Sequence, residues 1–115
     1  EIPNSVTSIE DWVFCGCTNL TSIKIPNSVT SIGEGAFRRC THLTTIEIPS
    51  SVTSIGQSAF CECTNLTMIE IPTSVKNVGG HAFTFTKARV IARASTQFAW
   101  AALSDHCTLV LKVDP

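Results

Sequence analysis

The sequence predicts an α/β repeat protein, a solenoid in which short parallel strands and single helical turns stack in successive units. The phrase IPNSVTSI occupies residues 2–9 and 25–32, and close variants occupy 48–55 and 71–78. The spacing is 23 residues each time, and a fixed period of this length is typical of repeat architectures. Thr, Ser and Ile are frequent and 43% of the residues are hydrophobic, which favours strands and polar turns over long helices.

The aligned units share columns of apolar residues. A unit of this size cannot bury its apolar positions alone, so neighbouring units must stack them into a continuous core. In the second unit and the start of the third these columns contain Ile25, Val29, Ile32, Phe37, Cys40, Leu43 and Ile46, with Pro26 and Ser28 recurring between them.

Each unit begins with a strand. In LTSIKIP (20–26), Ile23 and Ile25 alternate with polar residues, so they face inward while Lys24 faces out. Pro26 ends the strand because it has no N–H to donate to a central ladder.

The rest of the unit returns the chain to the next strand. SVTSI (28–32) predicts a second, shorter extended piece. GEGAFRRC (33–40) predicts a single helical turn with Phe37 and Cys40 on its inner side. Such a turn is too short to be stable alone, so we expect Phe37 to pack on Phe60 of the adjacent unit.

The fourth unit departs from this pattern. At the 23-residue spacing, Arg89 falls in the leucine column, Ala92 in the first isoleucine column and Ala94 in the next. The alternation of Val90, Ala92 and Ala94 still indicates a strand with smaller inward residues.

A cap is expected after the fourth unit, because terminal repeats must seal the core from water. STQFAWAALSDHC (95–107) predicts a helix and TLVLKV (108–113) a final strand. We therefore divide the chain into four repeats over residues 1–94 and a C-terminal cap over 95–115. Glu1 falls in the middle of the repeated phrase, which indicates an N-terminally truncated array.

Charge and hydropathy exclude several classes of function. The net charge is −1 and the pI about 6.3, so no basic stripe is available for nucleic acid. No apolar run is long enough for a membrane span, and no signal peptide is present in this segment.

The six cysteines include two C-x-C pairs that lie two units apart, so they do not converge on one metal ion. Cys17, Cys40 and Cys63 share one column, and we interpret them as small buried apolar residues. Cys15 and Cys61 lie in a variable column and are expected nearer the surface, as the more reactive thiols.

The residue types of catalysis do not form a constellation. The three histidines share no column, and no phosphate loop or paired-carboxylate motif is present. The serine column is interpreted as hydroxyls that satisfy backbone groups at a turn; its members are Ser5, Ser28, Ser51 and Ser74. We predict no catalytic residue, no cofactor and no metal site.

One outward column of the strands carries charge; it contains Glu1, Lys24, Glu47, Glu70 and Arg93. Neighbours in such a column lie about 5 Å apart. One interpretation is an ion-pair ladder, in which Lys24 and Arg93 flank two glutamates and each exposed bridge contributes about 0–1 kcal/mol. The other is a partner-binding site at Glu47, Met68 and Glu70, with Lys24 and Arg93 at its margins.

The pattern L-x-x-I-x-I-P…V-x-x-I-x-x-x-A-F-x-x-C over residues 1–94 resembles the BspA-type leucine-rich repeat. This resemblance implies a right-handed solenoid with a concave parallel sheet. It also implies a cell-surface or secreted protein of a host-associated bacterium or protist. The expected function is non-enzymatic binding of host or matrix proteins through the concave sheet, as in adhesion.

Two alternatives stay open from the sequence. The chain could be a structural spacer within a longer array, or part of an intracellular scaffold, which free thiols would favour. We also expect self-association through the uncapped N-terminal edge, since exposed strand edges pair readily.

Overall fold

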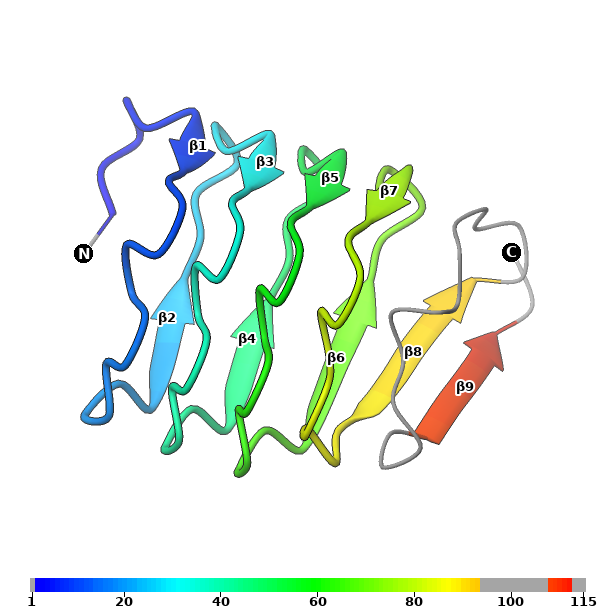
Figure 1. The fold of residues 1–115 in the computed structure, drawn as a ribbon. Coiled ribbons are helices and arrows are strands. Elements are labelled where there is room, and N and C mark those ends of the chain that lie inside the picture. The colour runs from blue at the N-terminus through cyan, green and yellow to red at the C-terminus, as the bar shows by residue number, and fades with distance from the viewer. Residues whose placement is uncertain (1, 94–107, 113–115) are drawn as a thin grey trace.

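The computed structural model describes residues 2–93 and 108–112. Over these residues the chain winds into successive rungs whose strands form two parallel sheets (Figure 1). The four-stranded sheet contains β1 (Ser8–Ile9), β3 (Ser31–Ile32), β5 (Ser54–Ile55) and β7 (Asn77–Val78). The five-stranded sheet contains β2 (Ser22–Lys24), β4 (Thr45–Glu47), β6 (Met68–Ile71), β8 (Arg89–Arg93) and β9 (Thr108–Lys112).

The strand register follows the 23-residue period through the first three units. Ser8 pairs with Ser31, and Ile23 pairs with Ile46, so each column stacks on itself. The core lies between the two sheets and the turns, and stacked phenylalanine rings run through it. The ring centroids of Phe14, Phe37, Phe60 and Phe83 are separated by 5.3, 5.4 and 5.8 Å in succession. The expected packing of Phe37 on Phe60 is confirmed.

The predicted helical turn at 33–40 is wrong: the segment forms successive β-turns. The N–H of Cys40 donates to the carbonyl of Phe37 at 3.2 Å, which closes one such turn. The N–H of Arg39 instead donates to Cys61 of the next rung at 2.9 Å. A helix would direct both N–H groups along its own axis, whereas here they alternate between the turn and the neighbouring rung.

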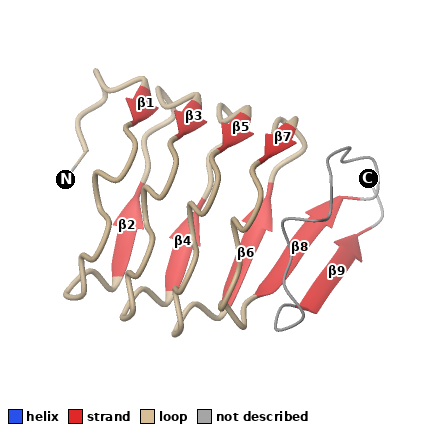
Figure 2. Cartoon of the chain, in the orientation of Figure 1, coloured by secondary structure: helices blue, strands red, loops and turns tan. Residues whose placement is uncertain are grey.

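These turns place two residues of each rung in the left-handed region. In the second rung they are Gly35 with φ 60° and Arg39 with φ 62°, each the third residue of its turn, as a type II turn requires. The helical prediction failed because a helical turn and a β-turn both bring residues i and i+3 together. The pattern of apolar columns does not distinguish these two structures. Figure 2 shows strands and loops alone over the described residues.

The register of the fourth unit corrects the sequence alignment. Met68 pairs with Arg89, and Ile69 with Val90, a step of 21 residues instead of 23. Arg89 is exposed and pairs with Met68, so it does not take the leucine position; the buried residue next to it is Ala88. Ala92 pairs with Ile71 and so fills the second isoleucine column, not the first. The connection into β8 is two residues shorter than the earlier connections. Aligning the sequence at a fixed spacing of 23 residues does not reveal this change.

The end of the array is described in part. The final strand predicted at 108–113 is confirmed over Thr108–Lys112, where β9 pairs in parallel with β8. Ala94 and the predicted helix at 95–107 lie outside the described residues. Among the residues that are described, none forms a helix with the length and apolar character needed to cross a bilayer.

Candidate binding surface on the five-stranded sheet

The serine column links the rungs. From the second unit on, each hydroxyl donates to a backbone carbonyl of the preceding rung: Ser28 to Val6 at 2.6 Å, and Ser51 to Val29 at 2.6 Å. Ser74 repeats the bond one rung further at 2.7 Å. The prediction that these hydroxyls satisfy backbone groups at the turns is confirmed for Ser28, Ser51 and Ser74, and each of their hydrogen bonds joins two neighbouring rungs.

The cysteine column does the same from inside the core. The thiols of Cys40 and Cys63 donate to the carbonyls of Phe14 and Phe37, each at 3.1 Å. Burial raises the pKa of Cys40 to about 11 and that of Cys63 to about 12. Both are fully buried and free, as expected, and Cys17 at the first rung is partly exposed.

The expectation for the variable column holds for Cys15, which is exposed, and is wrong for Cys61. Cys61 is only 6% exposed, and burial raises the pKa of its thiol although the Arg38 guanidinium acts in the opposite direction. Arg38 occupies the same column one rung before and reaches Glu62 at 3.4 Å, beside Cys61. In the described part of the chain, no three His, Cys, Asp or Glu side chains gather as metal ligands would.

The outward surface of β2, β4 and β6 is called here the sheet face. Side chains alternate along these strands, so Ile46 and Ile69 enter the core while Glu47, Met68 and Glu70 are exposed. Met68 is 46% exposed, beside the two carboxylates. Thr45 pairs with Met68, and the same register brings Glu47 opposite Glu70.

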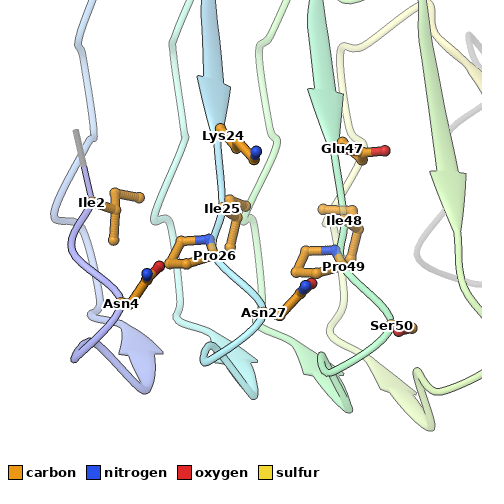
Figure 3. A pocket seen from close by; sticks show the side chains of 10 residues that line it. All are labelled: Ile2, Asn4, Lys24, Ile25, Pro26, Asn27, Glu47, Ile48, Pro49 and Ser50. Carbon is orange, nitrogen blue, oxygen red and sulfur yellow. The ribbon is translucent and has the colours of Figure 1, made fainter.

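The charges of the sheet face are not paired with one another. Lys24 lies opposite Glu47 in the register, yet no ion pair joins the two among the described residues. Figure 3 shows the Glu47 carboxylate directed away from Lys24. The described ion pairs of Glu62 lie instead at the turns, with Arg38 and Arg39. The ion-pair ladder is therefore not formed at Lys24–Glu47.

Arg93 does not flank the acidic pair. The shortened fourth unit places Ile91 opposite Glu70, and Arg93 falls two positions further along β8. The structure thus brings together four of the five predicted site residues, namely Lys24, Glu47, Met68 and Glu70. Arg89 pairs with Met68 in the sheet and is exposed. Among the described residues it is therefore the cationic side chain next to this methionine.

Two hollows open on this side of the molecule. The first, of about 660 Å³, lies where β2 and β4 end; it is lined by Ile2, Asn4, Lys24, Ile25, Pro26, Asn27, Glu47, Ile48, Pro49 and Ser50 (Figure 3). The second, of about 400 Å³, lies over β4 and β6; it is lined by Thr45, Ile46, Glu47, Ile48, Thr67, Met68, Glu70 and Pro72. They meet at Glu47 and Ile48.

The sequence did not identify the residues after the strands as part of this surface. The Ile-Pro-Asn phrase predicts a strand end and a turn, and both are present. Its contribution to a hollow arises only when the rungs stack and place Pro26 beside Pro49. The repetition of a proline followed by a polar residue was the signal available.

Known proteins resemble the chain over most of its length. A family model described as a BspA type leucine rich repeat region, in six copies, matches residues 1–99. No curated protein matches the chain.

Solved structures agree with this match. A leucine-rich repeat protein from Bacteroides ovatus is 34% identical, with a TM-score of 0.71, over 92% of this chain and 25% of that one. A leucine rich cell surface protein from Faecalibacterium prausnitzii is 32% identical, with a TM-score of 0.80, over 96% of this chain and 31% of that one. The chain therefore spans about a quarter to a third of the length of these two proteins. The recurring columns, the parallel sheets and these matches together show that the chain belongs to the BspA-type leucine-rich repeat family.

Proposed function

We propose that the chain is a non-enzymatic protein-binding module of a cell-surface or secreted protein, and that it adheres to host or matrix proteins through the sheet face. The observation that carries the proposal is the group of Glu47, Met68 and Glu70. Two carboxylates without an ion-pair partner among the described residues stand beside a methionine that is 46% exposed. Burying the methionine would favour association, and the carboxylates would select a basic partner.

The surface location is supported by the family and by the similarity to a cell surface protein. A contact of this kind needs a face whose side chains project from a rigid support. The sheet face meets that need because the strands beneath it are held by the buried columns of Ile46 and Ile69. Lys24 stands at one margin of the proposed contact, and Arg89 at the other.

The test is a charge reversal on the sheet face. Surface plasmon resonance against a panel of immobilised extracellular-matrix proteins compares the wild type with the Glu47→Lys, Glu70→Lys double variant. We expect at least one matrix protein to bind, and the double variant to bind it at least about tenfold more weakly, because like charges would face the basic partner. Circular dichroism should show the same fold in both proteins, since both side chains are exposed.

A matched control is Glu10→Lys with Glu34→Lys, which changes the net charge equally at exposed positions outside both hollows. The control should bind like the wild type. Equal loss in the two variants would show a long-range charge effect without a site at the sheet face. Undiminished binding by the sheet-face variant would move the site to the turns around Arg38 and Arg39.

The thiols favour a second candidate, an intracellular scaffold. Cys15, Cys17, Cys40, Cys61 and Cys63 are free, and disulfides are the usual state of paired cysteines in secreted proteins. Mass measurement of alkylated thiols in the protein taken from its own cells separates the two candidates. A disulfide would favour the surface protein.

We also propose that the first rung mediates self-association at high concentration. Ile2, Phe14, Leu20 and Ile23 line a hollow of about 380 Å³ at this end, and Val13 is 51% exposed. Sedimentation velocity over a range of concentrations should show reversible dimers, which Val13→Glu should weaken. A monomer at every concentration would contradict the proposal.

A further inference from the structure

The two hollows of the sheet face adjoin and together cross the rungs; the pair is called here the groove. Glu47 and Ile48 line both hollows, so the two hollows adjoin at these residues. The groove runs from Asn4 in the first rung to Pro72 after the third strand of the sheet. With about 4.8 Å between neighbouring rungs, these ends are about 14 Å apart, the reach of four or five extended residues.

Proline and isoleucine side chains form the floor of the groove where β2 and β4 end, and polar side chains surround them. Pro26 and Pro49 are buried side by side after β2 and β4, with Ile48 next to them (Figure 3). Proline has no N–H, so this part of the floor does not compete for the polar groups of a ligand. Such a floor accepts apolar atoms and leaves polar recognition to the two rims.

One rim offers amides and a hydroxyl. Asn4, Asn27 and Ser50 occupy the same position of successive rungs, and none of their side chains hydrogen-bonds to another described residue. Figure 3 shows the Asn4 and Asn27 amides reaching toward Pro26 and Pro49, over the floor. A carboxamide both donates and accepts, so it matches the paired N–H and C=O of a peptide backbone.

The opposite rim selects charge. Lys24, Glu47 and Glu70 contribute a net charge of −1 at neutral pH, and the two carboxylates are adjacent across β4 and β6. Unpaired like charges side by side are relieved by a cation between them. Lysine or arginine of a ligand would fit there, and Met68 would contact an apolar neighbour of that cation.

We propose that the groove binds an extended peptide segment of the partner protein that carries lysine or arginine next to an apolar residue. The backbone of the segment lies against the Asn4, Asn27 and Ser50 rim, and its basic side chain binds between Glu47 and Glu70. This inference rests on the proposed binding function of the same sheet face. An oligosaccharide fits less well because no aromatic side chain lines either hollow for sugar rings to stack on.

The probe is an acetylated, amidated peptide with Lys-Leu-Lys in a Ser-Gly background, titrated into isotope-labelled protein and followed by amide chemical shifts. A peptide with Glu-Leu-Glu in the same background and a linear hexasaccharide are the comparisons. We expect saturable shifts at residues 24, 25, 27, 47, 48, 50 and 68–70 with the basic peptide alone. No binding of that peptide at millimolar concentration, shifts elsewhere, or binding of the hexasaccharide alone would overturn the inference.

Variants separate the inference from the proposed function. Glu47→Gln with Glu70→Gln tests the cation site, and Asn27→Ala tests the backbone rim, with Asn65→Ala as a matched exposed asparagine outside the groove. We expect the Asn27 variant to bind the peptide about threefold to tenfold more weakly, and the Asn65 variant to bind it unchanged.

The same variants are then measured on the matrix protein found by surface plasmon resonance. Loss in the double glutamine variant with no loss in Asn27→Ala would overturn the extended-peptide inference and leave the proposed function standing. Full binding of the matrix protein by both variants would overturn both the extended-peptide inference and the proposed function. Loss in both would support the peptide inference and the proposed function together.

Discussion

Replacing Phe60 with alanine should lower the free energy of unfolding by about 3–5 kcal/mol. Phe60 is fully buried, and its ring lies between Phe37 at 5.4 Å and Phe83 at 5.8 Å, nearly parallel to both. Truncation would leave a cavity in the middle of the stack, and the rungs on either side cannot close it without breaking their hydrogen bonds. Urea denaturation followed by circular dichroism measures the loss.

The matched control is Phe85→Ala in the adjacent rung. Phe85 is 59% exposed and outside the stack, so its truncation should change stability by less than about 0.5 kcal/mol. A loss below about 1 kcal/mol for Phe60→Ala would show that the stacked rings do not hold the rungs together. A similar loss for both variants would mean that the exposed ring contributes as much as the buried one.

Raising the pH above 9 should destabilise the protein through the buried thiols of Cys40 and Cys63. Burial raises their pKa from the ordinary 9.0 to about 11 and about 12. The folded thiols stay protonated while those of the unfolded chain ionise, so the stability they contribute is complete below pH 9. It is lost as the pH rises toward 11 and 12. Between pH 8 and 10 the free energy of unfolding should fall by about 3 kcal/mol for the two thiols together.

Threonine at both positions removes the titrating groups and keeps the hydrogen bonds. Thr86 occupies the same column and donates from its hydroxyl to the Phe60 carbonyl at 2.6 Å, so the site accepts threonine. Denaturation at several pH values, with reductant present, should show a shallower fall for Cys40→Thr with Cys63→Thr than for the wild type. Equal slopes would exclude the buried thiols as the cause.

The column pattern could predict which residues enter the core because stacking repeats the same environment at every rung. Phe37, Cys40 and Val29 are buried for this reason, and strand alternation likewise placed Glu47 and Glu70 on the surface. The pattern could not predict the backbone of the turns. In the turns, hydrogen bonds to the neighbouring rung compete with the local hydrogen bonds of a helix. Which set forms depends on the position of the neighbouring rung, and the sequence pattern does not give that position.

The remaining errors have a similar origin. The burial of Cys61 depends on the Arg38 side chain that runs beside it, and a variable column gives no sign of which neighbour will do so. The position of Arg93 depends on the length of the connection before β8, which is two residues shorter than a fixed period assumes. Glu47, Met68 and Glu70 could be placed because they precede that change. The groove floor required three rungs to be stacked first.

The hydrogen bonds between rungs have a consequence for how such genes change in length. Each bond of a given type joins residues at one fixed separation: 22 for the serine column, 23 for Thr44 and Thr67, and 26 for the cysteine column. A duplication or deletion of 23 codons within the first three units, wherever it starts, therefore restores every donor to an equivalent acceptor. Unequal recombination can lengthen or shorten this part of the array without repair by further substitutions. The 21-residue step into β8 ends that freedom, because a unit copied across it would meet its neighbour two residues out of register.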